Sequence, residues 1–138
     1  MDETKKSMPV VGQAILIYIC SGILGLLISG VFGKLYRYII GPYLGDSVFV
    51  IGGEELDNLL GGMTFGYLFF MGLFTGFWVR KKVLFIWLVG FVLVGWTSFW
   101  SIKDFGASIL IALLGLLLGQ LIRWVLRVVA KKPTTPKV

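Results

Sequence analysis

Residues 61–102 read GGMTFGYLFFMGLFTGFWVRKKVLFIWLVGFVLVGWTSFWSI, which is two uncharged apolar runs separated only by the basic residues 80–82. An α-helix rises about 1.5 Å per residue, so roughly 20 apolar residues cross the hydrocarbon core of a bilayer. The runs 61–79 and 83–102 both have about this length. The stretch therefore predicts two transmembrane helices joined by a tight basic turn.

Two further apolar runs flank this pair, one at residues 10–32 and one that begins at Phe105 and continues as a basic and apolar stretch to Ala130. Of the 138 residues, 57% are hydrophobic and 14% charged, which excludes a soluble globular domain and a disordered chain. We predict an all-α polytopic membrane protein, a single domain over residues 1–138 with four transmembrane helices in a compact bundle. Its predicted parts are spans at about 10–32, 61–79, 83–102 and 105–130, one long outer loop at 33–60 and a disordered C-terminal tail at 131–138.

The charges are distributed unequally between the two sides of this arrangement. Ten of the 13 basic residues lie in the N-terminal tail, the turn at 80–82 and the C-terminal end, whereas five of the seven acids lie on the opposite side. The positive-inside rule then places both termini in the cytoplasm, and the short loops with strong charge asymmetry indicate a bacterial cytoplasmic (inner) membrane. This bias accounts for the net charge of +6, so we expect no nucleic-acid partner.

Small residues recur at helical spacing in three of the four runs. Small-xxx-small spacing lets the backbones of two membrane helices approach closely, and such contacts are the main readable signal for helix association in lipid. The predicted packing residues are Ser21, Gly25, Ser29, Gly33, Gly62, Gly66, Gly72, Gly76, Gly115 and Gly119. They serve either to pack the spans of one chain together or to form an interface between subunits.

Two groups of charged residues are candidates for contacts outside the membrane. Glu54, Glu55 and Asp57 follow a Gly-Gly pair, which predicts the first turn of a helix, where carboxylates are stabilised by the helix dipole. They are also a possible outer contact for a partner. On the inner side, a basic collar that attracts anionic lipid headgroups, or alternatively docks a cytoplasmic protein, is predicted from Arg80, Lys81, Lys82, Arg123 and Arg127.

Several functional classes are disfavoured by what the chain lacks. It has no histidine and one cysteine, so it cannot build a histidine or multi-cysteine metal site, and we expect no metal and no cofactor. No acid or base lies within the part of any run that would occupy the hydrocarbon core, which argues against proton-coupled transport. Without a cluster of positioned titratable groups, we also expect no enzymatic activity.

The sequence thus favours a non-enzymatic accessory or assembly subunit of a membrane complex, which packs with another membrane protein or with copies of itself. The alternative is a homo-oligomeric passive channel, or a small-solute or lipid transporter without an ionisable coupling residue inside the membrane.

Overall fold

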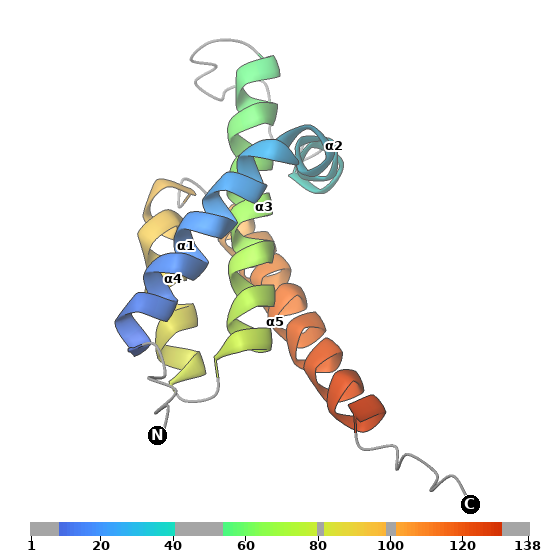
Figure 1. Cartoon of the computed structure of the whole chain (residues 1–138). Coiled ribbons are helices and arrows are strands. Elements are labelled where there is room, and N and C mark those ends of the chain that lie inside the picture. The colour runs from blue at the N-terminus through green and yellow to red at the C-terminus, as the bar shows by residue number, and fades with distance from the viewer. Residues whose placement is uncertain (1–8, 41–53, 80–81, 99–101, 131–138) are drawn as a thin grey trace, which may run out of the picture.

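The computed structural model describes residues 9–40, 54–79, 82–98 and 102–130, and within these ranges the chain is helical with no strand (Figure 1). The helices are α1 (Val10–Leu27), α2 (Ser29–Ile40), α3 (Glu54–Trp78), α4 (Val83–Ser98) and α5 (Ile102–Ala130). The prediction of an all-α chain is confirmed.

Three of these helices are long and apolar enough to cross a membrane: α1, α3 from Leu59 onward, and α5 from Phe105 onward. The helix α4 has 16 residues, which corresponds to about 24 Å, and it is shorter than a typical span. A membrane location is therefore supported by three candidate spans.

The predicted span at 10–32 is wrong as a single helix, because the chain turns at Ile28. This residue has φ −103° and ψ 11°, outside the α-helical region, and α2 then leaves the direction of α1 so that Figure 1 shows it end-on. A straight helix over residues 10–40 would measure roughly 46 Å and exceed the hydrocarbon core. The turn instead lets α2, which carries Lys34 and Arg37, lie across the end of α1.

The predicted loop at 33–60 is also helical at both ends. The helix α2 continues to Ile40, and α3 begins at Glu54, directly after the Gly-Gly pair that predicted a helix start there. Further along, the spans predicted at 83–102 and 105–130 leave Lys103 and Asp104 as a turn between them; this is wrong, because both residues belong to the first turn of α5. The predicted tail at 131–138 lies outside the described residues.

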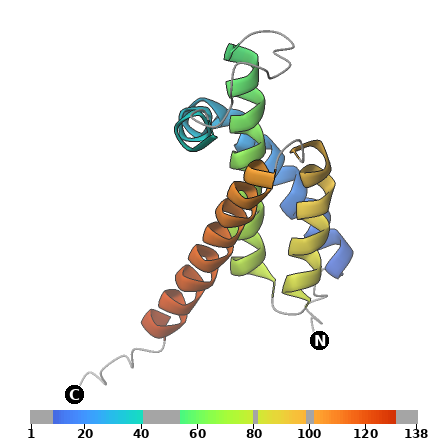
Figure 2. The ribbon, with the colours of Figure 1, turned by 180° about the vertical axis from the view of Figure 1, so that it is seen from behind.

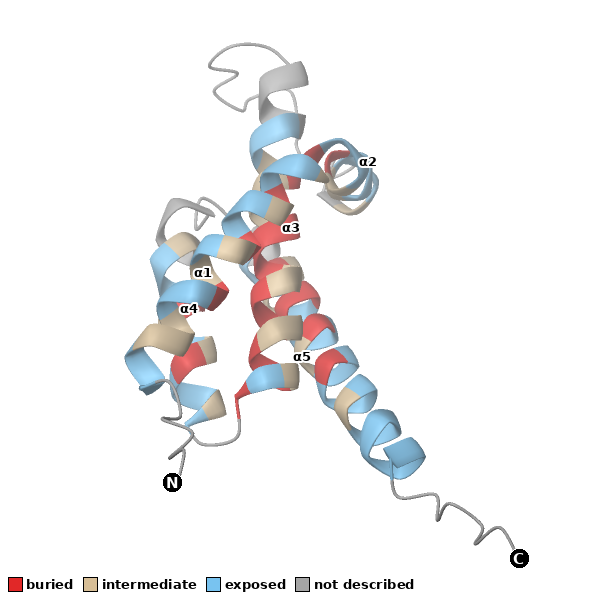
Figure 3. Ribbon diagram, viewed as in Figure 1, coloured by how far each residue is buried: buried red, intermediate tan, exposed pale blue. Residues whose placement is uncertain are grey.

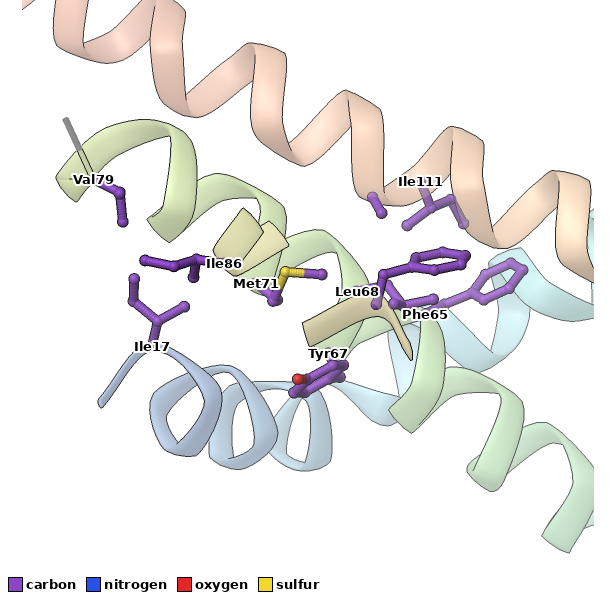
Figure 4. Close-up of a cluster of buried hydrophobic side chains, with 10 residues drawn as sticks. Ile17, Phe65, Tyr67, Leu68, Met71, Val79, Ile86 and Ile111 are labelled. Atoms are coloured by element: carbon purple, nitrogen blue, oxygen red, sulfur yellow. The ribbon is translucent and has the colours of Figure 1, made fainter. Parts of the chain in front are cut away.

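The helix α3 is the centre of the fold and contacts each of the other four helices. Its contact with α5 is the most extensive, and its contact with α4 is much smaller. Figure 3 shows the buried residues concentrated along α3. In Figure 4, Phe65 and Leu68 of α3 lie on the side of Ile111 of α5, and Ile17 of α1 lies beside Ile86 of α4. The C-terminal end of α5 diverges from α3, as Figures 1 and 2 both show.

Candidate functional site

The backbone of α3 lies directly against the backbones of α1 and α2. A Cβ atom added to Gly66 would lie 2.9 Å from the Cα atom of Gly25. A Cβ atom added to Gly62 would overlap the carbonyl oxygen of Ser29 and the backbone of Gly33. Real Cβ atoms do not approach this closely, so only glycine fits at these positions of α3.

The contact between α3 and α5 is built in the same way from both sides. On α3, Gly72 faces the backbone of Ala112, and Gly76 faces that of Leu116. On α5, Cβ atoms added to Gly115 and Gly119 would overlap carbonyl oxygens of α3. The structure places all ten predicted packing residues in buried positions between helices of the one chain.

The helix α4 is attached differently, through hydrogen bonds from aromatic side chains. The hydroxyl of Tyr18 on α1 donates to the carbonyl oxygen of Ile86 at 2.7 Å, and the hydroxyl of Tyr67 on α3 donates to that of Gly90 at 3.3 Å. In turn, Nε1 of Trp87 donates to the carbonyl oxygen of Ala112 on α5 at 3.4 Å. Hydrogen bonds between helices stabilise association in lipid, where water does not compete.

Gly90 also makes room for this arrangement, because a Cβ atom there would lie 2.6 Å from Cε1 of Tyr18. The residues predicted from the sequence did not include Tyr18, Tyr67, Trp87 and Gly90. The available signal was an aromatic side chain with a polar tip well inside an apolar run, where the tip needs a partner.

Two further buried polar side chains, those of Ser21 and Thr75, contact atoms of their own helices. The Ser21 hydroxyl donates to the carbonyl oxygen of Ile17 at 2.6 Å, and the Thr75 hydroxyl lies 3.9 Å from the sulfur of Met71 one turn earlier. Both side chains are fully buried among the described helices.

Ser108 is the exception, since its hydroxyl oxygen is buried and has no hydrogen-bond partner among the described residues. A buried unpaired hydroxyl costs about 1–3 kcal/mol, so Ser108→Ala is expected to leave the free energy of unfolding unchanged or to raise it by up to about 1 kcal/mol. Chemical unfolding in detergent measures this change. A loss of stability would show that the hydroxyl has a partner.

A pocket opens at the end of the molecule where α5 diverges from α3. We call it the basic pocket; its volume is about 320 Å³, and its walls come from the ends of α3 and α4 and from α5. The lining residues are Gly76, Val79, Val83, Gln120, Arg123, Trp124 and Arg127. Arg123 is fixed at one wall, because its Nη1 donates to the carbonyl oxygen of Val79 at 3.0 Å, just beyond the C-terminus of α3.

The structure brings two residues of the predicted basic collar together. Arg123 and Arg127 share the basic pocket, and Lys82 is exposed in the turn before α4, with φ 58°. Arg80 and Lys81 lie outside the described residues.

The acidic residues Glu54, Glu55 and Asp57 occupy the first turn of α3, at the end of that helix remote from the basic pocket. Their side chains lie outside the described residues. Among the residues that the structure describes, no three His, Cys, Asp or Glu side chains are grouped so as to hold a metal ion.

Comparison with protein families, with curated proteins and with solved structures found no match for this chain.

Proposed function

We propose that this chain is a non-enzymatic assembly subunit of a membrane complex, which packs against another membrane protein or against copies of itself. The observation that carries the proposal is that polar side chains within the apolar helices form hydrogen bonds inside the chain. Ser21, Tyr18, Tyr67 and Trp87 all donate to backbone carbonyl oxygens of the chain itself. Polar groups that hold helices together are not available to carry a solute or a proton.

The proposed topology has four spans, with α4 as the short fourth span and both termini in the cytoplasm of a bacterium with an inner membrane. The start of α1, the turn between α3 and α4 and the end of α5 all lie at one end of the molecule, which supports this topology (Figure 1). The same end carries Lys82, Arg123 and Arg127, as the positive-inside rule requires for a cytoplasmic face.

On the opposite side, α2 is proposed to lie in the interface between the lipid and the water. Its outward surface has an apolar part with Val31, Leu35 and Tyr38, and a basic part with Lys34 and Arg37. Such a division suits a helix in the membrane surface. The first turn of α3 protrudes beyond α2, and we propose that Glu54, Glu55 and Asp57 contact the partner there (Figure 1).

Cysteine labelling distinguishes this proposal from the channel alternative. In a Cys20→Ser background, Ser21→Cys and Thr75→Cys are expected to resist a water-soluble, membrane-impermeant thiol reagent added to inside-out membrane vesicles, which expose the cytoplasmic face, because both positions are fully buried between helices. Lys82→Cys is the positive control, since Lys82 is exposed outside the apolar helices. Labelling of Ser21→Cys or Thr75→Cys at a rate similar to that of Lys82→Cys would indicate an aqueous path and support the channel.

Native mass spectrometry of the gently extracted protein then tests the assembly role itself. A second membrane protein bound in fixed stoichiometry, or a defined homo-oligomer whose buried cysteines stay unlabelled, is the expected result. A monomer without any bound protein under conditions that preserve other complexes would contradict the proposal.

A further inference from the structure

The basic pocket has the shape and charge of a site for an anion. It lies in the wedge between α3 and α5: at Gly76 the two backbones are still in contact, and beyond it α5 diverges (Figure 2). Two of its lining residues, Arg123 and Arg127, are cationic, and none of its lining residues is acidic.

The donors of the pocket come from one face of α5. Gln120 lies three and four residues before the adjacent Arg123 and Trp124, and Arg127 lies four and three residues after them, so the four side chains project on one side of the helix. The bond from Arg123 to the carbonyl oxygen of Val79 fixes this guanidinium before any ligand arrives. A guanidinium has several N–H groups, so it can bind a phosphate oxygen while it also holds a carbonyl.

The remainder of the pocket is apolar and lies at the end of the apolar helices. Val79 and Val83 form one wall, and Trp124 contributes an indole ring, which favours the headgroup level of a bilayer. Further into the apolar part of α5, on the same face as Gln120, lie the exposed side chains of Leu113 and Leu117. The basic pocket is thus followed by an apolar face of α5. A molecule with a charged end and hydrocarbon chains matches this arrangement better than a soluble anion does.

We infer that the basic pocket binds the phosphate group of one anionic glycerophospholipid from the surrounding bilayer. The phosphate lies between Arg123 and Arg127, the glycerol region lies against Trp124, and an acyl chain follows Leu117 and Leu113 along α5. This site differs from the general attraction of a basic collar for anionic lipid, because it holds a single lipid at a defined place. The inference requires a membrane location and is independent of which protein is the assembly partner.

The test is native mass spectrometry of the protein titrated with phosphatidylglycerol, and in parallel with phosphatidylcholine. Arg127 is exposed, so Arg127→Gln removes a charge with little effect on packing. We expect this substitution to weaken the binding of the first phosphatidylglycerol about tenfold, as for loss of one charge-assisted hydrogen bond. Lys82→Gln, which removes an equal charge outside the pocket, is expected to change it less than about twofold.

A second variant tests the pocket without changing charge. Val83→Trp fills the space between α4 and α5 and is expected to reduce phosphatidylglycerol binding while phosphatidylcholine binding stays the same. The melting temperature in phosphatidylcholine shows whether each variant is folded. If Val83→Trp lowers the melting temperature, the binding of phosphatidylglycerol by Arg127→Gln and by Lys82→Gln tests the inference instead.

Three outcomes would overturn the inference. Equal losses for Arg127→Gln and Lys82→Gln would indicate a nonspecific basic surface, and no loss for Arg127→Gln would exclude the pocket. Competition by glycerol phosphate at concentrations similar to those of the lipid would identify a soluble phosphate compound as the ligand.

Discussion

Replacing Gly115 with leucine is expected to separate α5 from α3, whereas the same replacement at Gly106 is expected to have no effect on folding. The Cβ atom of a residue at 115 would overlap the carbonyl oxygen of Phe69, and no flexible side chain is present to move aside. We expect a loss of at least about 3 kcal/mol, because backbone rather than side-chain atoms must be displaced. At Gly106 of the same helix, no atom of another described helix lies within 4 Å of the added Cβ.

The helix α1 offers the same comparison. Gly25→Leu would bring a side chain onto the backbone of α3 near Tyr67 and Met63, whereas Gly22 has open space. Fluorescence-detected size exclusion in mild detergent measures the folded fraction for both pairs. If Gly22→Leu and Gly106→Leu were as damaging as Gly25→Leu and Gly115→Leu, the glycine contacts within the chain would not determine the fold.

The second large effect is expected for the tyrosines that hold α4. The double variant Tyr18→Phe with Tyr67→Phe removes two hydrogen bonds to α4. The helix α4 then keeps its small contact with α3 and the hydrogen bond from Trp87 to α5. Such bonds contribute about 0.6–1.7 kcal/mol each in a membrane, so we expect the double variant to lose about 1–3 kcal/mol.

The location of this loss is more informative than its size. Hydrogen–deuterium exchange in lipid nanodiscs is expected to become faster in α4 and to stay unchanged in α3 and α5. Tyr38→Phe serves as the control, because Tyr38 is 83% exposed on α2. Uniformly faster exchange, or no change in α4, would show that these hydroxyls do not hold the helix.

Helices and their packing faces could be predicted from the sequence because both depend on local patterns. An uncharged apolar run of bilayer length gives a helix wherever it lies in the chain. The spacing of Gly72 and Gly76 likewise marks a close-packing face before the partner helix is known.

The features that were missed depend on residues far apart in the sequence. No proline or charge marks Ile28, and the course of α2 depends on its contact with Gly62 of α3. The bond between Tyr18 and Ile86 joins positions 68 residues apart. The basic pocket combines the end of α3 with α5, so it could be found only after the divergence of these helices was known.

The central place of α3 also has a consequence for biosynthesis. The ribosome makes α1 and α2 before α3, so the small residues Gly25, Ser29 and Gly33 are present before Gly62 and Gly66, against which they pack, have been made. During that interval the groove formed by these small residues lacks the helix that fills it in the finished fold. Insertion of α3 closes this groove and at the same time presents the second glycine face, which α5 fills last. The order of synthesis therefore matches the order in which the helices can pack, with α3 joining α1 and α2 before α5 packs against α3.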